Sequence, residues 1–352
     1  MNNTWKYAAS LLLAAMIAVS PVAAQTTDIA DLQKAADDLA ETFAKALPFN
    51  STVGLNWSDA YIKKFPHFGV GLVGGVTTID AGEIASVMEK MGYDDVGDIP
   101  DVLPLPAAAF EGRLGGFVWP FDIGFKIGFI PESIGDGMSD SGLALDYFLV
   151  GFDVRYALLE GKGFMPKLSV GGGFNYLKGG VSATADGGQD YTFTYNPGTG
   201  DETHTISVTD PEVGLEWKTT VIDLKAQASW KFLIFTPYVG LGLSHGWSSA
   251  GYFIDSDVTY DGNELTDAQL AALLADLREY NDYLEQSGQG GFDIPNVSST
   301  GIDSSVDVTG FAMRTFGGLS ITPFPFVRFD LTGLYNFFDG AYGGSLGIRI
   351  QF

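Results

Sequence analysis

The sequence of 352 residues contains no cysteine, which excludes disulfides and thiolate metal sites. Positive charge is scarce: 19 lysines and arginines stand against 43 aspartates and glutamates, for a formal net charge of −24. Nucleic acid is therefore not an expected partner, because phosphate binding needs basic patches. Long hydrophobic runs are also missing. After residue 24 no stretch reaches 18 consecutive apolar residues, which excludes a helical membrane protein.

The first 24 residues predict a cleavable secretory signal. Lys6 precedes an apolar stretch from Ala8 to Val19, and Pro21 precedes the small-residue site Val22-Ala23-Ala24. This order is typical of a signal peptide, and the apolar part is too short to span a bilayer as a helix. We therefore expect an exported chain that is either soluble or a β-barrel.

Composition favours the barrel. The chain has 46 glycines and 13% aromatic residues, whereas only 18% of its residues are charged, against roughly 25% in an average soluble domain. Glycine weakens a soluble strand but suits strands that bend and approach one another closely.

The last twelve residues, AYGGSLGIRIQF (341–352), alternate between two faces. One face carries Leu346, Ile348 and Ile350, and the other carries Ser345 and Arg349. A period of two with one apolar and one polar side predicts a strand between lipid and water. Taken alone, the segment also suits an amphipathic strand of a soluble sandwich.

A last strand that ends on an aromatic residue, here Phe352, resembles the closing strand of bacterial outer-membrane β-barrels. The resemblance implies that Phe352 is the assembly signal and that the barrel-assembly machinery and outer-membrane lipid are partners. It also implies a location in the bacterial outer membrane.

Repeated alternation predicts the strands of the wall. The predicted segments are 49–57, 67–79, 106–119, 121–131, 142–158, 164–184, 213–230, 235–253, 302–321, 324–337 and 341–352. Eleven is an odd number, so 49–57 is assigned to an internal plug, which leaves ten wall strands; a strand missed in a long loop would give twelve. The fold class predicted is therefore all-β: a transmembrane antiparallel β-barrel of about 10–12 strands, with an N-terminal helical plug segment and short helices in extracellular loops.

The chain divides into three predicted regions. These are the signal peptide at 1–24, an N-terminal helix or plug at 25–48, and the barrel at 49–352. The short aromatic-proline connections near residues 120, 237 and 323 fall on one side, as periplasmic turns do. The long acidic loops fall on the other, extracellular side; they comprise 80–105, 185–212 and 254–301.

The polar faces of the predicted strands carry charges. Arg or Lys at the lipid midplane costs roughly 2–4 kcal/mol, so these side chains should face the lumen. Two alternatives stay open: the charges pair and seal a narrow interior, or they line a charge-selective pore. The predicted lumen-facing set is Glu111, Arg113, Lys126, Asp153, Arg155, Lys167, Asp223, Lys225, Arg314, Arg328, Asp330 and Arg349.

Two helices are expected within the outer loops. One spans about 267–286, begins with a capping box of Thr266 and Gln269, and carries an apolar stripe; the other lies near 81–91. Packing on the barrel rim is the default role of these stripes, and binding a hydrophobic ligand is the alternative. The candidate ligand-binding residues are Leu270, Leu273, Leu274, Leu277, Ile84 and Met88.

No catalytic motif is present. The three histidines, His67, His204 and His245, lie on separate segments, and neither a nucleophile elbow nor a zinc-protease helix motif occurs. We expect no enzymatic activity, no cofactor and no metal site.

Three functions remain. A plugged lumen with apolar helices at its mouth resembles long-chain fatty-acid transporter (FadL-like) barrels, which implies passive uptake of small hydrophobic molecules such as fatty acids. That family has fourteen strands and an Asn-Pro-Ala plug signature, which is missing here; Asn196-Pro197-Gly198 lies in a loop. The alternatives are a structural or adhesive surface barrel without transport and, less favoured, a general diffusion porin.

Overall fold

The computed structural model describes residues 29–80, 102–129, 143–161, 165–184, 188–195, 202–264 and 302–352, together with isolated positions at 82, at 266 and within 268–278. The predicted signal peptide at 1–24 lies outside these residues. So do most of the predicted loop at 80–105 and the side chains of all six candidate ligand-binding residues.

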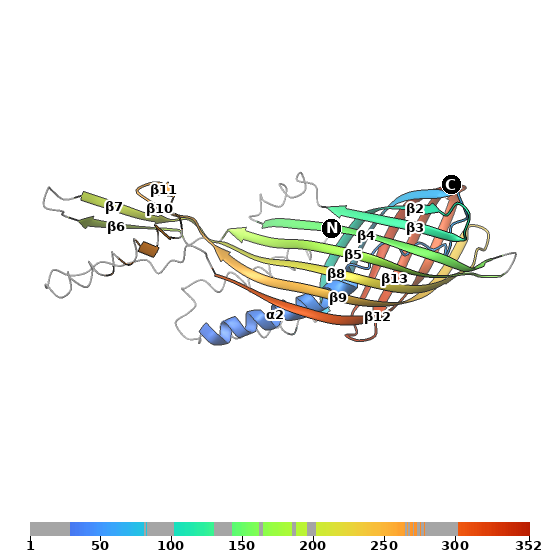
Figure 1. Ribbon diagram of the computed structural model, residues 1–352, viewed down its shortest axis with the longest axis horizontal. Coiled ribbons are helices and arrows are strands. Elements are labelled where there is room, and N and C mark those ends of the chain that lie inside the picture. Colours follow the sequence, from blue (N-terminus) through green and yellow to red (C-terminus); the bar gives the residue numbers. More distant parts are fainter. Residues whose placement is uncertain are drawn as a thin grey trace.

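Ten antiparallel strands form a closed barrel, in which β1 pairs with β14 on one side and β2 on the other (Figure 1). The predicted fold class is confirmed at ten wall strands. The strands are β1 (Phe68–Asp80), β2 (Val102–Gly115), β3 (Phe121–Phe129), β4 (Leu143–Glu160), β5 (Lys167–Thr184), β8 (Glu212–Ser229), β9 (Phe235–Asp255), β12 (Ile302–Phe324), β13 (Val327–Asn336) and β14 (Tyr342–Gln351).

The two ends of the barrel differ. The turns at 116–120, 230–234 and 325–326 are short and lie at the same end as Phe352, whose ring stacks on that of Phe326 at 6.2 Å. Short turns mark the periplasmic side of outer-membrane barrels, so we call this end the inner end and the opposite one the outer end.

The strands of the wall differ in length, and β1 and β2, with 13 and 14 residues, are intermediate. Strands β3, β13 and β14 have 9, 10 and 10 residues, about one membrane crossing for a tilted strand. Strands β4, β5, β8, β9 and β12 have 18 to 23 residues and extend past the short ones at the outer end (Figure 1). We call these five strands the tall wall.

A second sheet prolongs the tall wall. It consists of β6 (Gln189–Tyr195), β7 (Glu202–Val208), β10 (Val258–Tyr260) and β11 (Asn263–Glu264), in the order β11-β10-β7-β6. The Thr209 N–H donates to the Asp257 carbonyl at 2.9 Å, so the β8–β9 ribbon passes into the β7–β10 pair. The prediction places no strand in the loops 185–212 and 254–301, which is wrong for this outer sheet. The missed signal is the alternating, β-favouring run Tyr191-Thr-Phe-Thr-Tyr195.

The N-terminal region runs through the barrel. Helix α2 (Ile29–Asn50) lies against the tall wall, and Asp37 accepts a hydrogen bond from the Ser304 hydroxyl at 2.8 Å near the outer end of β12. Residues 51–64, the plug segment, then cross the lumen to the inner end, where β1 begins. No helix among the described residues is long and apolar enough to cross a membrane.

The predicted strand at 49–57 is wrong, although its place inside the barrel is right. The helix continues to Asn50, and the plug segment has no regular structure. Gly54 and Leu55 have φ angles of +91° and +57°, a left-handed conformation that breaks an extended strand. Side chains of the wall, rather than a neighbouring strand, bond this backbone.

Candidate functional site: the plugged lumen

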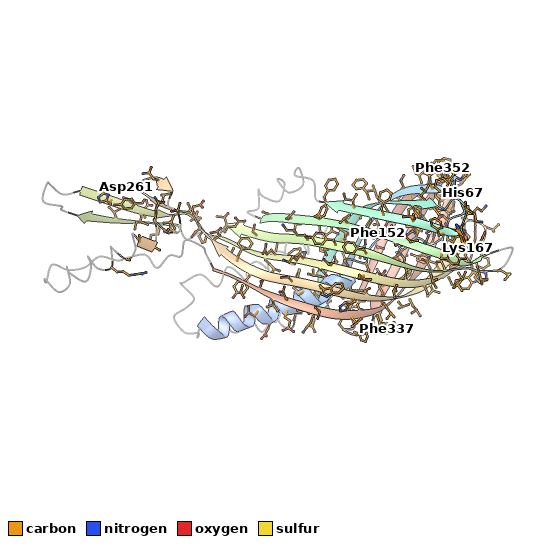
Figure 2. The ribbon with its side chains drawn as sticks, in the orientation of Figure 1. His67, Phe152, Lys167, Asp261, Phe337 and Phe352 are labelled. Atoms are coloured by element: carbon orange, nitrogen blue, oxygen red, sulfur yellow. The ribbon has the colours of Figure 1, made fainter. Side chains whose placement is uncertain are left out.

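The wall separates an apolar outside from a charged inside. Phe152 is 53% exposed and points outward (Figure 2), whereas its neighbour Asp153 is buried. The same alternation places Phe125 outside and Lys126 inside. An outer surface of exposed phenylalanines and leucines over a charged interior is the pattern of a barrel surrounded by lipid.

Charges of opposite sign from neighbouring strands pair within the lumen. Arg113 of β2 lies 2.6 Å from Asp122 of β3 and 2.7 Å from Asp153 of β4. Arg155 binds Asp122 through two nitrogens, at 2.8 and 2.9 Å, and Lys225 pairs with Asp153. These side chains are at most 5% exposed, so each charge is compensated away from water.

A second pair lies on the tall wall. The Arg314 guanidinium of β12 binds Asp223 of β8 through two bonds, of 2.6 and 2.8 Å. The Ser244 hydroxyl of β9 donates to the same carboxylate at 2.9 Å. The pairing thus ties together three adjacent strands.

Side chains of the wall also hold the backbone of the plug segment. The Lys126 ammonium donates to the carbonyls of Ser51 and Val53 at 2.6 and 2.7 Å. Gln227 donates to the Trp57 carbonyl at 2.6 Å, and the Ile62 N–H donates to Asp122 at 2.9 Å. The polar groups of an irregular backbone are therefore satisfied although they are buried.

Trp57 is the aromatic anchor of the plug segment. Its indole N–H donates to Glu111 of β2 at 2.7 Å, and the same carboxylate accepts the Leu55 N–H. The Arg349 guanidinium lies 4.5 Å above the indole ring, within the range of a cation–π interaction.

Asp59 anchors the inner half of the plug segment. Its carboxylate lies 2.6 Å from Arg328 and 3.1 Å from Lys167, and Arg349 is 3.7 Å away. Burial opposes ionisation, but these three cations outweigh it and hold the pKa of Asp59 well below its usual range. Burial also raises the pKa of the neighbouring Tyr61 to about 12.

Two cavities lined by described residues lie beside the plug segment, and both are small. A cavity of about 20 Å³ lies between Trp57 and Arg349, and one of about 10 Å³ lies near Asn56 and Lys126. A single water occupies about 10–15 Å³ on this scale, so these cavities have room for water and not for an organic solute.

The outer half of the interior is apolar. Phe43 of α2 packs on Trp217 of β8 with ring centroids 4.9 Å apart, and the facing wall contributes Leu149, Leu177 and Leu215. On its opposite side α2 carries Lys45 and Glu41, which are 57% and 44% exposed and form an ion pair of 2.6 Å. The tall wall is therefore an apolar trough that the amphipathic helix α2 covers.

The structure brings the predicted lumen set together. Ten of its residues are buried, and the two partly buried members, Lys167 and Asp330, pair with Asp59 and Arg349. The predicted set lacks Asp122, although the alternation of its strand places it on the same polar face as Lys126. It also omitted Asp59 and Trp57, which lie in irregular backbone where the sequence carries no periodic signal.

Other predicted features lie apart from the lumen. Thr266 donates its N–H to Gln269 at 3.0 Å, as a capping box requires. His204 pairs with Asp261 in the outer sheet at 2.7 Å, and His245 lies against Phe311 on the outer face of the barrel. Among the described residues no three His, Asp or Glu side chains are grouped as metal ligands.

Comparison with solved structures returns outer-membrane barrels. The crystal structure of Ail, the attachment invasion locus protein of Yersinia pestis, covers 81% of this chain and 97% of its own at 9% identity, with a TM-score of 0.27. The match to the outer membrane protease OmpT from Escherichia coli covers 84% of this chain and 100% of OmpT, at 10% identity and a TM-score of 0.35. The match to the toluene transporter TbuX of Ralstonia pickettii covers 86% of this chain and 90% of TbuX, at 11% identity and a TM-score of 0.23. No protein-family model and no curated protein matches the sequence.

The chain is a bacterial outer-membrane β-barrel. A closed ten-strand wall, apolar outside and charged inside, accounts for this location.

Proposed function

We propose that this outer-membrane barrel is a sealed anchor that presents its outer sheet and tall wall at the cell surface. The observation that carries the proposal is the plug segment, which fills the lumen through Asp59, Trp57 and the lysines of the wall. A narrow lumen in which most of the described charges pair with one another offers an ion or sugar little space and few unpaired charges.

The extension outside the membrane supports a role in surface binding. The two-stranded ribbon of β8 and β9 continues into β7 and β10, so the outer sheet is joined to the wall rather than to a loose loop. Figure 2 shows Asp261, in this sheet, at the end of the molecule opposite to Phe352. Residues 254–303 carry eleven acids and one base, Arg278, so a partner with a basic surface fits this region best.

Electrical recording in planar bilayers tests the seal. We expect the wild-type chain to insert without conductance steps, whereas a variant in which glycine and serine replace residues 51–62 conducts ions. Steady conductance by the wild-type chain, in protein whose trypsin-resistant barrel is intact, would contradict the proposal. The predicted diffusion porin would then be the better description.

Uptake of small hydrophobic molecules is the second candidate, and the apolar trough favours it. The buried side chains around Phe43 would form an apolar surface at the outer mouth if α2 moved away. The predicted contacts Leu270, Leu273, Leu274, Leu277, Ile84 and Met88 remain proposals for the entrance to this trough.

Lipid mass spectrometry of the purified chain, paired with liposome swelling, distinguishes the two candidates. Uptake predicts a co-purified fatty acid that is lost when Trp217 is replaced by arginine, with no swelling in small sugars. A sealed anchor predicts neither a bound fatty acid nor swelling.

A further inference from the structure

Two lysines face each other on the outside of the tall wall. Lys178 of β5 and Lys218 of β8 are direct cross-strand partners, and both are exposed. Side chains of such a pair leave the same face of the sheet with Cβ atoms about 5 Å apart. Like charges placed directly opposite each other destabilise a sheet unless something of opposite charge lies between them.

The pair lies at the membrane boundary. Two residues closer to the inner end, the outward positions of β5, β8 and β9 hold Tyr176, Thr220 and Trp247. The outward positions that follow on these strands are apolar apart from His245. Phe148 lies beside Lys178 in the same row and makes an edge contact with Tyr176 at 6.4 Å. Aromatic residues mark the interface of a membrane barrel, so the two ammonium groups lie at the level of the lipid headgroups.

Asp307 of β12 is exposed in the same row, beyond Ser249 of β9, and two further acidic residues lie farther outward. Asp146 and Glu216 are both exposed and occupy the next outward row, on either side of Gly180. Among the described residues, neither Lys178 nor Lys218 comes within 4.0 Å of a carboxylate. The two positive charges therefore have no ion-pair partner within this part of the protein.

We propose that Lys178 and Lys218 together bind the phosphate of an outer-leaflet lipid. The phosphate lies between the two ammonium groups, and the acyl chains run inward over Tyr176, Phe148 and Trp247. Lysines at this depth keep their stems on apolar surface and their charges among headgroups.

A membrane lipid fits this site better than a soluble anion. An anion from the water phase must pass Asp146 and Glu216, which repel it, whereas a lipid phosphate approaches within the membrane plane, below those carboxylates. The site also offsets the repulsion that the acidic outer loops exert on an anionic leaflet. The two lysines then give this acidic chain a direct contact with an anionic headgroup.

Native mass spectrometry of the full chain in dodecyl maltoside tests the proposal, with diphosphorylated lipid A as the probe. We expect the Lys178→Gln/Lys218→Gln variant to lose about 30-fold in affinity, since each lysine near an anionic lipid surface contributes roughly five-fold. The matched control is Lys63→Gln/Lys64→Gln, which removes two exposed lysines at the inner end. The control should change the affinity less than two-fold.

Further measurements identify the source of the bound phosphate and the cause of the lost affinity. Inorganic phosphate at the same concentration should not compete, and lipid A without phosphates should bind the wild-type chain as weakly as phosphorylated lipid A binds the double variant. Equal losses in the two double variants would overturn the proposal, as would competition by inorganic phosphate. Guanidinium unfolding of both variants verifies that each retains the wild-type stability.

Discussion

The Asp59 carboxylate lies 2.6 Å from the Arg328 guanidinium, and this contact joins the start of the chain to its penultimate wall strand, β13. Lys167 of β5 and Arg349 of β14 approach the same carboxylate. One acidic residue in irregular backbone thus connects three strands that do not all neighbour one another in the barrel.

Replacing this carboxylate should destabilise the barrel. In an Asp59→Asn variant the three cations lose a buried partner, and breaking a buried ion pair from one side costs about 3–5 kcal/mol. Guanidinium unfolding in detergent micelles measures the loss. Glu41→Gln, which breaks an exposed pair on α2, is the control and should change stability by less than about 0.5 kcal/mol.

The contribution of Asp59 should also depend on pH with a definite sign. Its pKa is lowered from the ordinary value of 3.8, so its stabilisation is complete above about pH 5 and is lost as the pH falls through the lower folded-state value. The stability difference between wild type and Asp59→Asn should therefore be constant from about pH 7 to pH 5 and shrink below about pH 4. A difference that grew on acidification would show that another group dominates.

The stability of helix α2 in the barrel should depend on one aromatic contact. Phe43→Ala removes the ring that packs on Trp217, and truncating a buried phenylalanine costs about 3 kcal/mol or more. Hydrogen exchange of the α2 amides should rise accordingly while that of β13 and β14 stays unchanged. Lys45→Ala, on the exposed side of the helix, should leave the exchange pattern as it is.

The lipid-facing side of the wall can be tested at Phe152. Because this ring is 53% exposed on the outer face, Phe152→Arg should place a charge in hydrocarbon and cost about 2–4 kcal/mol of stability in phospholipid vesicles. Glu216→Arg, on the same side but beyond the lysine row, should cost less than about 1 kcal/mol. Equal costs at the two positions would mean that the membrane boundary lies elsewhere.

Phe352 should matter more for assembly than for stability. Its ring is 59% exposed and contacts the rings of Phe68 and Phe326, with centroids 5.3 and 6.2 Å away. If Phe352 is read by the barrel-assembly machinery, Phe352→Ala should lower the amount of folded barrel in cells several-fold and leave the stability of refolded protein nearly unchanged. Phe324→Ala, 61% exposed at the same end, is the control and should affect neither.

Features with a period of two were predictable from the sequence. The wall strands were located to within a few residues, because lipid on one side and a polar lumen on the other force the same alternation on every strand. That alternation also identified Arg113, Asp153 and Arg314 as lumen residues, although it could not say which charge pairs with which.

Features built from irregular backbone were not predictable in this way. The plug segment has no repeat, and its shape depends on side chains of strands that come much later in the chain, such as Gln227 and Arg349. Asn50, predicted within a strand, ends α2 and donates to Thr77 and to the Leu105 carbonyl instead. Tertiary contacts of this kind override the local preference.

The path of the chain through the lumen has a consequence for biogenesis. Because α2 lies toward the outer end and β1 starts at the inner end, the polypeptide before β1 runs along the lumen to its inner end. The complete set of contacts to Asp59, from β5, β13 and β14, exists only when the wall surrounds this segment. Enclosing the leading segment and shutting the seam between β1 and β14 therefore complete each other.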